Sequence, residues 1–221
     1  MRPPGEAEVP RGRLLYKGAE ADVIKAKWCG LPAVYKVRKS LPYRLPELDT
    51  EIRRQRTLHE GQMIRSAKKA GVAAPYLYFV DTARTTIVME FVKGERMKDL
   101  ASFLPAQESS PLFNRLGAEV ARLHAAGIMH GDLTTANVLR RKGELVFVDF
   151  GLSMHSSRVE DHAVDLRLIK ETIVGAHSEV AQAALAALFR GYASVAGEGR
   201  ARAVLRQLRA IERRGRYARV E

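Results

Sequence analysis

The chain has 221 residues, of which 46% are hydrophobic and 28% are charged, a mixture that can bury a core in one domain or two small lobes and argues against a disordered chain. The 37 Lys and Arg residues outnumber the 25 Asp and Glu residues, and the resulting net charge of +12 favours a polyanionic partner.

Two further features of the composition bear on localisation. Cys29 is the only cysteine, so an intrachain disulfide is excluded and a reducing compartment is expected. Residues 1–13 carry charges and prolines instead of an apolar stretch, and no apolar run approaches the length of a membrane span. We therefore expect a flexible N-terminus over residues 1–13, a cytoplasmic location and no membrane partner.

The first predicted elements are β-strands. Apolar residues precede and follow a short turn at residues 18–21, and a further strand is expected over Ala33–Val37. Lys36 lies near the end of that strand. A lysine in a strand is most often an ordinary surface residue, so its position alone gives Lys36 no role.

A basic helix is expected after the proline-containing segment at residues 42–46. Glu60 shares one helix face with the apolar residues three, four and seven positions later, so its carboxylate is expected to point inward toward the strand that carries Lys36. Glu51, one face round, is the alternative ion-pair partner for Lys36. An ordinary solvated glutamate is the other interpretation of either residue.

Two strand-like runs follow at residues 75–80 and 85–92, separated by a polar turn. The second run ends before Lys93-Gly94-Glu95, which has the composition of a hinge. A short helix is expected over residues 98–104.

Residues 114–126 are expected to form an amphipathic helix. Leu116, Val120 and Leu123 repeat at i, i+4 and i+7, so they share one face. Gly127 is expected to end this helix in a left-handed conformation.

The most informative motif follows that helix. The tripeptide His130-Gly131-Asp132 is followed by Asn137 and, after a predicted hairpin with a strand at residues 145–148, by Asp149-Phe150-Gly151. At about one in twenty for each of four fixed residues, a chance match in a chain of this length is on the order of one in a thousand, and the second tripeptide makes it rarer still. The combination is a catalytic-loop signature of protein-kinase-like phosphotransferases.

This signature assigns roles along the chain and makes ATP and Mg²⁺ the expected cofactors. Asp132 is expected to act as a base or to orient the attacking water, whereas Asn137 and Asp149 are expected to hold Mg²⁺. In the N-terminal half, Lys36 is the candidate for gripping the α- and β-phosphates, and Glu60 is the candidate for positioning Lys36.

The turn at residues 18–21 is the candidate phosphate loop, with Gly18 as a nucleotide contact. Protein kinases carry three glycines in this loop, whereas this chain has Glu20 and Val23 where glycine is expected. Its backbone should therefore cover phosphates less flexibly.

The run that ends before the hinge is the candidate adenine site. Met89 is expected at the back of the adenine pocket, and the backbone groups of Glu90 and Val92 are expected to hydrogen-bond the adenine edge. The alternative is an ordinary strand end with a methionine in the core.

The residues after Gly151 contain no Ala-Pro-Glu, the tripeptide that closes the activation segment of larger protein kinases, so we expect no peptide-docking floor. Asp165 shares a helix face with Leu168 and Ile169, so it is expected to point inward and accept the backbone amides of the catalytic loop. The alternative is an aspartate favoured by the dipole at a helix N-terminus.

The excess of positive charge is concentrated in two segments. Residues 36–69 hold ten Lys and Arg against four Asp and Glu, and residues 197–221 hold eight Arg against three Glu. Such density favours contact with RNA phosphates, although a solvated helix face is an equal alternative. The candidate RNA contacts in the second segment are Arg206, Arg209, Arg213, Arg214 and Arg216.

The motifs in combination resemble one family. They are Gly18–Ala21, Arg56-Thr57 with Glu60, His130–Asn137, Asp149–Ser153, Asp161–Leu166 and Arg213–Arg216. From about Leu14 to Arg216 the chain resembles the PRPK family, the small atypical kinase subunits of the KEOPS complex. The catalytic loop by itself is shared with RIO and aminoglycoside kinases.

The resemblance implies an α+β, minimal bilobal protein-kinase-like fold, with an N-lobe at residues 14–92, a shortened C-lobe at 93–210 and a basic tail at 211–221. It implies a role in making threonylcarbamoyladenosine in tRNA, in which the ATP site acts mainly as an ATPase or switch for the complex, with serine/threonine autophosphorylation as well. The implied partners are tRNA, the threonylcarbamoyl-transferase subunit on the C-lobe and a small KEOPS subunit on the N-lobe. The tail departs from the family pattern because Tyr217, Ala218 and Glu221 interrupt its basic residues.

Two other functions remain open. One is a RIO-like or small-molecule kinase, which would use the same catalytic loop on a free substrate. The other is a basic tRNA-binding scaffold with a vestigial ATP site. The complete set of Lys36, Asp132, Asn137 and Asp149 counts against the scaffold.

Overall fold

The computed structural model describes residues 11–101, 106–176 and 179–217, and the chain divides into two compact units. Among these residues, no helix is long and apolar enough to cross a membrane.

The division between the units falls inside a helix. Unit 1 runs to Arg65 and resumes over Pro75–Lys93, and unit 2 holds Ser66–Ala74 and the chain from Gly94 onward. Helix α1, Pro46–Lys69, therefore begins in unit 1, and its last turn belongs to unit 2.

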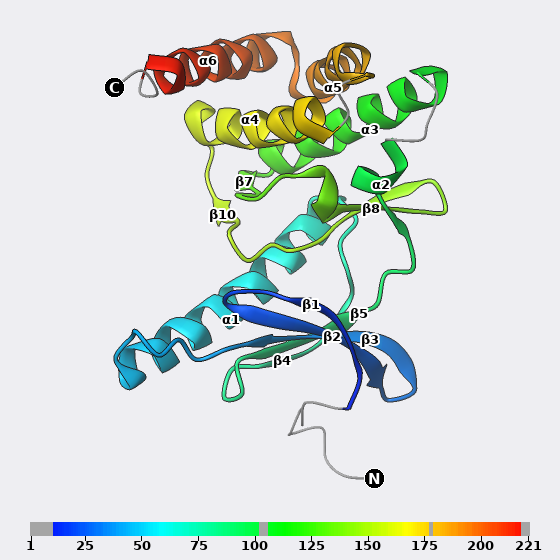
Figure 1. The fold of residues 1–221 in the computed structure, drawn as a ribbon. Helices are drawn as coiled ribbons and strands as arrows, with labels where there is room; N and C mark the ends of the chain where they lie inside the picture. The colour runs from blue at the N-terminus through cyan, green and yellow to red at the C-terminus, as the bar shows by residue number, and fades with distance from the viewer. Residues whose placement is uncertain (1–10, 102–105, 177–178, 218–221) are drawn as a thin grey trace. The chain divides into compact units, whose positions relative to one another are not determined.

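Unit 1 is built on a five-stranded antiparallel sheet with the strand order β1-β2-β3-β5-β4 (Figure 1). Its strands are β1 (Arg13–Lys17), β2 (Ala21–Trp28), β3 (Leu31–Arg38), β4 (Leu77–Asp81) and β5 (Thr86–Glu90). Successive strand residues point to opposite faces of a sheet, so the side chains of Tyr35 and Lys36 lie on opposite faces. Tyr35 packs in an apolar cluster with Val88, and in the same cluster Trp28 stacks on Phe79 with 5.6 Å between ring centroids. Lys36 faces α1.

Unit 2 is mainly helical (Figure 1). Its elements are β6 (Glu95–Arg96), α2 (Met97–Ala101), α3 (Ala106–Ala125), β7 (Ile128–Met129), a 3-10 turn (Thr135–Asn137), β8 (Val138–Arg141), β9 (Glu144–Phe147), β10 (Met154–His155), α4 (Val159–Ala176), α5 (Ala181–Ala196) and α6 (Glu198–Tyr217). The strands form two small antiparallel sheets, β6-β8-β9 and β7-β10. Helix α3 packs on α5, and α4 packs on α6.

Two glycines allow α3 and α5 to approach closely. A Cβ atom added to Gly117 of α3 would lie 1.9 Å from the carbonyl oxygen of Leu188, and one added to Gly191 of α5 would lie 1.8 Å from that of Asn114. Each glycine thus faces the backbone of the other helix. The side-chain amide of Asn114 also donates to the Ala187 carbonyl at 3.3 Å across this contact.

The sequence-based expectation of strands and of the basic helix is confirmed, whereas the helix expected over residues 114–126 begins too late. α3 starts at Ala106. Its first turns, which include Pro111, carry small and polar residues outside the apolar repeat, so the repeat did not indicate them. Gly127 has the expected left-handed conformation, with φ 67°. The helix expected over residues 98–104 is α2, and residues 102–105 lie outside the described residues.

The expected lobe limits stay predictions. The structure groups Ser66–Ala74 with unit 2, and α6 continues through Tyr217, past the residue where a separate tail was expected. Most of the N-terminus at residues 1–13 lies outside the described part of the chain.

The close α3–α5 contact yields a stability prediction. We expect Gly117→Ala and Gly191→Ala each to lower the free energy of unfolding by about 1–3 kcal/mol, because a methyl group would force the helix backbones apart. Gly175→Ala in α4 is the control, since a Cβ there meets no atom within 4 Å, and it should be neutral or stabilise by up to about 1 kcal/mol. Guanidinium unfolding measures all three, and equal effects at the three sites would contradict the close packing.

Candidate active site

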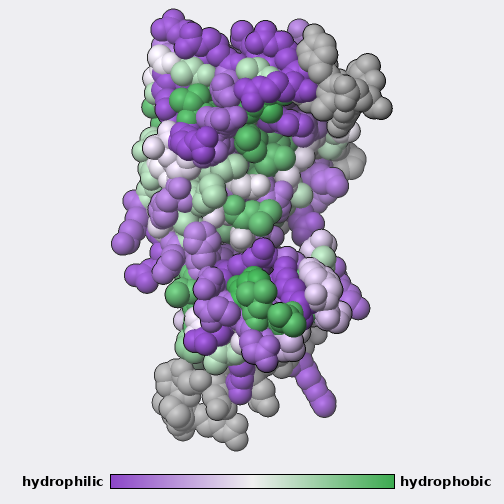
Figure 2. All heavy atoms as spheres, turned by 90° about the vertical axis from the view of Figure 1, so that its left-hand side faces the viewer, coloured by the Kyte–Doolittle hydropathy of each residue, from purple (hydrophilic) through white to green (hydrophobic). Residues whose placement is uncertain are grey.

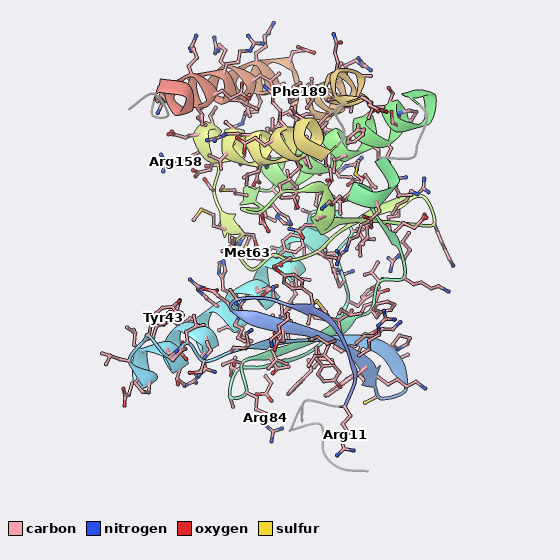
Figure 3. The ribbon with its side chains drawn as sticks, viewed as in Figure 1. Arg11, Tyr43, Met63, Arg84, Arg158 and Phe189 are labelled. Carbon is pink, nitrogen blue, oxygen red and sulfur yellow. The ribbon has the colours of Figure 1, made fainter. Side chains whose placement is uncertain are left out.

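The candidate phosphate-gripping residues lie in unit 1. β3 places Lys36 opposite α1, where its Nζ lies 2.7 Å from Oε1 of Glu60, and the Glu60 side chain has no exposed surface. Met63, labelled on α1 in Figure 3, is buried on the same helix face as Glu60. Glu51, the alternative partner, is exposed and accepts a hydrogen bond from Gln55 instead. The expected ion pair is therefore present, while its part in catalysis stays a prediction.

Glu60 has a second cationic partner that was not predicted from the sequence. Arg38, two residues after Lys36 on the same face of β3, places Nη2 2.6 Å from Oε2 of Glu60. Each carboxylate oxygen thus has its own cation. A buried carboxylate needs such compensation, because burying an unpaired charge is costly. The alternation of Lys36 and Arg38 along the strand was the signal that could have revealed this contact.

The turn between β1 and β2 closes tightly around Gly18. Its N–H donates to the Ala21 carbonyl at 3.0 Å, and an added Cβ would lie 2.6 Å from that carbonyl oxygen. A side chain would therefore not fit at Gly18 without a shift of the backbone. Glu20, in the same turn, is bound by cations, so its carboxylate does not point freely into solvent.

The candidate adenine residues lie at the end of β5. Met89 is buried and pairs in register with Val34, which places it on the same sheet face as Lys36. The N–H of Glu90 donates to the Tyr76 carbonyl at 2.8 Å, so only the carbonyl of Glu90 can serve the expected adenine contact. Val92 is also buried.

In unit 2, the 3-10 turn brings Asn137 against Asp132. Nδ2 of Asn137 donates to the backbone carbonyl and to Oδ2 of Asp132, both at 2.9 Å. This contact orients the Asp132 carboxylate. It also uses the nitrogen of the amide, so the oxygen of Asn137 is the atom that can ligate a hard cation.

Asp149 follows β9 in a left-handed conformation, with φ 63°. Its Oδ1 accepts the N–H of Gly151 at 3.3 Å, and its side chain is exposed. The neighbouring Phe150 is fully buried, with its ring centroid 4.9 Å from that of His130. Buried aromatic packing thus fixes the segment, while the carboxylate of Asp149 stays accessible.

Asn137 and Asp149 are the predicted cation-binding residues of unit 2. Within the part of the chain that the structure describes, no three His, Cys, Asp or Glu residues converge to form a metal site of their own. Mg²⁺ is commonly held by one or two carboxylates together with substrate phosphates and water. The oxygens of Asn137 and Asp149 fit that mode of binding.

Asp165 of α4 binds the backbone of the catalytic loop through its carboxylate. Its Oδ2 accepts the N–H of His130 at 2.6 Å, and its Oδ1 accepts the N–H of Gly131 at 2.9 Å. The side chain is fully buried. Asp165 therefore points inward as expected and holds the backbone amides of the loop, in place of the alternative role at a helix N-terminus.

A buried histidine pair extends this support toward α5 and α6. His124 contacts Asp165 through Nε2 at 3.2 Å and the Tyr192 hydroxyl through Nδ1 at 2.9 Å. Its ring stacks on that of His162, with 4.0 Å between centroids. His162 contacts the Ser156 carbonyl through Nε2 at 2.9 Å and Arg200 through Nδ1 at 3.0 Å. No sequence pattern indicated this network, because its members come from four different helices and from the segment before α4.

The two contacts of His162 specify its protonation. The Ser156 carbonyl can only accept, so Nε2 carries the proton, and the Arg200 guanidinium can only donate, so Nδ1 is an acceptor. Burial lowers the pKa of His162 to about 4, and the neighbouring His124 and Arg200 act in the same direction. Burial also raises the pKa of the Tyr192 hydroxyl, which therefore stays protonated.

The candidate RNA contacts lie on α6, where nitrogen-tipped side chains project outward in Figure 3. Arg206, Arg209 and Arg213 are exposed and share one helix face, and Arg202 joins them at the same spacing. Arg214 was expected in this set but points elsewhere, 3.9 Å from Glu160, because successive helix residues are about 100° apart. The side chain of Arg216 lies outside the described residues.

Hydrophilic residues dominate the surface over α6, at the top of Figure 2. On this helix, the exposed residues Arg202, Arg206, Arg209 and Arg213 form an arginine stripe.

Comparison with known proteins places these features in a family. Residues 17–178 match the protein kinase domain. The chain is 37% identical over 211 residues to the KEOPS complex subunit Bud32 of Pyrococcus abyssi, covering 93% of this chain and 96% of that subunit. It is 39% identical over 204 residues to a probable bifunctional tRNA threonylcarbamoyladenosine biosynthesis protein of Methanothermobacter thermautotrophicus, covering 92% of this chain and 36% of that protein.

Among solved structures, the Rio2 kinase complex with ADP, Mg²⁺ and phosphoaspartate from Chaetomium thermophilum is similar, with a TM-score of 0.65 and 20% identity. The match covers 93% of this chain and 70% of the Rio2 chain. This likeness shows a shared protein-kinase-like fold, with a sheet-containing first unit and a helical second unit.

The histidine pair yields a pH prediction. The pKa of His162 is about 4 in the folded protein and near 6.5 in the unfolded chain, so the unfolded chain binds this proton first. Stability is therefore complete above pH 6.5 and falls as the pH decreases toward 4, by at most about 1.4 kcal/mol per pH unit from this residue.

We expect His162→Gln to flatten this slope, because glutamine does not titrate. Its side-chain amide can still donate to Ser156 and accept from Arg200, so the packing of the site should be kept. Chemical unfolding at several pH values between 6.5 and 4.5 measures it. Burial also lowers the pKa of His130, so part of the slope should remain. A slope unchanged in His162→Gln would show that this histidine is not the titrating group.

Proposed function

Because the chain belongs to the protein kinase family and, within it, to the Bud32 subunits of the KEOPS complex, we propose that it binds Mg·ATP and transfers the γ-phosphate to serine, threonine or water. The observation that carries this proposal is the buried contact of Lys36 with Glu60. A lysine held by a buried carboxylate on the partner helix is the arrangement that kinases use to grip ATP phosphates. An ordinary surface lysine needs no such partner.

The remaining residues complete the chemistry. Lys36 contacts the α- and β-phosphates, the backbone near Gly18 covers them, and Met89 with the backbone of Glu90 and Val92 contacts adenine. Asp132, fixed by the Asn137 amide, orients the attacking hydroxyl or water and accepts its proton.

Asn137 and Asp149 would hold Mg²⁺, which offsets the negative charge of the phosphates when it is bound. Asp165 acts indirectly, since its carboxylate fixes the backbone amides of His130 and Gly131.

We further propose that this ATP chemistry supports threonylcarbamoyladenosine formation in tRNA. The names of the two relatives support this role. The chain matches 36% of the bifunctional protein. The rest of that protein is long enough to hold a second enzyme domain. We propose that the threonylcarbamoyl-transferase subunit binds unit 2 and that a small KEOPS subunit binds unit 1. We also propose that the protein acts in the cytoplasm.

Two other functions give different results in one assay. ATP turnover is measured with and without the transferase subunit. A KEOPS-type ATPase is slow alone and changes rate with that subunit, whereas a RIO-like or small-molecule kinase acts efficiently on a free substrate without it. A tRNA-binding scaffold with a vestigial ATP site shows no turnover in either condition.

The arginine stripe is the proposed contact for tRNA. Its four members are exposed on one face of α6, and the structure gives none of them an ion pair among the described residues. Cations that no described carboxylate neutralises are available to neutralise phosphates and release their counterions. By contrast, Arg214 already has a contact with Glu160.

The metal-binding proposal predicts that Asp149→Ala lowers Mg²⁺-dependent ATP turnover by about 10²-fold or more. Asn137→Ala should act in the same direction but less severely. Asp149→Ala should still fold, because the removed side chain is exposed, with a small loss of stability because alanine is less favourable than aspartate at φ 63°. Glu144→Ala, which removes another exposed carboxylate of unit 2, is the control. Unchanged turnover in folded Asp149→Ala protein would reject the kinase proposal.

The tRNA proposal predicts a change in salt dependence. Replacing Arg206, Arg209 and Arg213 by Gln should reduce the slope of log affinity against log salt by roughly 0.7 to 0.9 for each tRNA phosphate that the variant no longer neutralises. Filter binding across a salt series measures it. The control replaces three exposed cations of α1, which are Arg54, Arg65 and Lys69. If only the control changes the slope, α1 is the RNA contact and the arginine stripe is not.

A further inference from the structure

The candidate phosphate loop is attached to the rest of unit 1 at several points. The N–H of Lys39 donates to the Glu20 carbonyl at 2.9 Å, and its Nζ donates to the Gly18 carbonyl at 2.5 Å. The same Nζ lies 3.2 Å from the carboxylate of Asp22. One lysine just after β3 therefore holds both ends of the turn.

Glu20 supplies a further attachment through its side chain. Its carboxylate forms an ion pair with Arg56 of α1 and lies 3.4 Å from Arg44, which precedes that helix. Partial burial acts to raise the pKa of Glu20, but the hydrogen bond and charge of Arg56 and the charge of Arg44 outweigh it and hold the pKa below its ordinary value. The carboxylate is thus ionised and neutralised by contact.

The helix residue that holds the loop is one turn away from the residue that holds Lys36. Arg56 and Glu60 are four positions apart on α1 and so lie on neighbouring parts of one face. The Arg56 carbonyl also accepts a hydrogen bond from Arg38 at 3.4 Å. One face of α1 therefore contacts both the phosphate loop and the phosphate-gripping lysine.

We propose that Glu20 is a positioning residue, whose contact with Arg56 ties the phosphate loop to α1 and keeps its own charge away from the bound phosphates. This inference rests on the proposed binding of Mg·ATP at this site. It accounts for a carboxylate at a position where a protein-kinase loop carries glycine. The loop then moves with the helix that bears Glu60 and does not act as an independent flap.

The charges give this proposal a distinctive consequence. A released carboxylate in the loop would repel the triphosphate, because like charges disfavour one another at short range. Removing Arg56 alone should therefore be worse for nucleotide binding than removing Arg56 and the Glu20 charge together. A purely structural role for the two side chains predicts the opposite order.

The first test uses the full chain without nucleotide. In Glu20→Gln we expect the backbone amides of residues 17–22 to exchange hydrogen roughly three- to tenfold faster than in wild type, because the tether to α1 is weakened. Glu51→Gln is the control, since it removes an exposed carboxylate from α1 itself. Exchange unchanged in Glu20→Gln, or increased equally in the control, would overturn the tether.

The second test measures binding of Mg·ATP to Arg56→Met and to the double variant Glu20→Gln/Arg56→Met. We expect Arg56→Met to bind roughly three- to tenfold more weakly than wild type and the double variant to recover part of that loss. A double variant that binds no more tightly than Arg56→Met contradicts the proposal. A wild-type protein that does not bind Mg·ATP rejects the proposed function, and hydrogen exchange then decides the tether by itself.

Discussion

The buried carboxylate of Glu60 is the constraint on which unit 1 depends. An ionised group with no exposed surface is stable only with partners in contact, and removing one partner of a buried pair typically costs about 3–5 kcal/mol. Lys36 and Arg38 each contact one oxygen of Glu60. This requirement fixes α1 against β3. Because Arg56 lies one turn from Glu60, the same constraint also places the residue that holds the phosphate loop.

Unit 2 uses a second buried carboxylate in a different way. Asp165 has no exposed surface, and its oxygens are satisfied by the backbone amides of His130 and Gly131. The conformation of the catalytic loop therefore follows from the position of α4. His124 contacts the same carboxylate and, through the stack with His162, connects it to α6. Both units thus position candidate catalytic groups through buried acids on helices, and strand geometry alone would not achieve this.

Much of this arrangement could be predicted from local patterns. Helical spacing placed Glu60 on the apolar face of α1, and the same reasoning pointed Asp165 inward. The contacts of Glu60 with Arg38 and of Glu20 with Arg56 were not predicted, because each depends on how a strand or turn meets a helix distant in sequence.

Choosing residues by charge density alone, without regard to helical spacing, led to one wrong prediction. Arg214 was grouped with Arg206, Arg209 and Arg213 although it lies about 100° away from Arg213 on α6.

We propose that the chain binds Mg·ATP and that Lys36 and Asp149 contribute to this binding. Calorimetric titration of ATP tests this proposal most directly. We expect wild-type protein to bind ATP with Mg²⁺ and to bind it much more weakly with chelator, and Lys36→Met to lose most affinity in both conditions. Affinity that is insensitive to Mg²⁺ and unchanged in Lys36→Met would contradict the account.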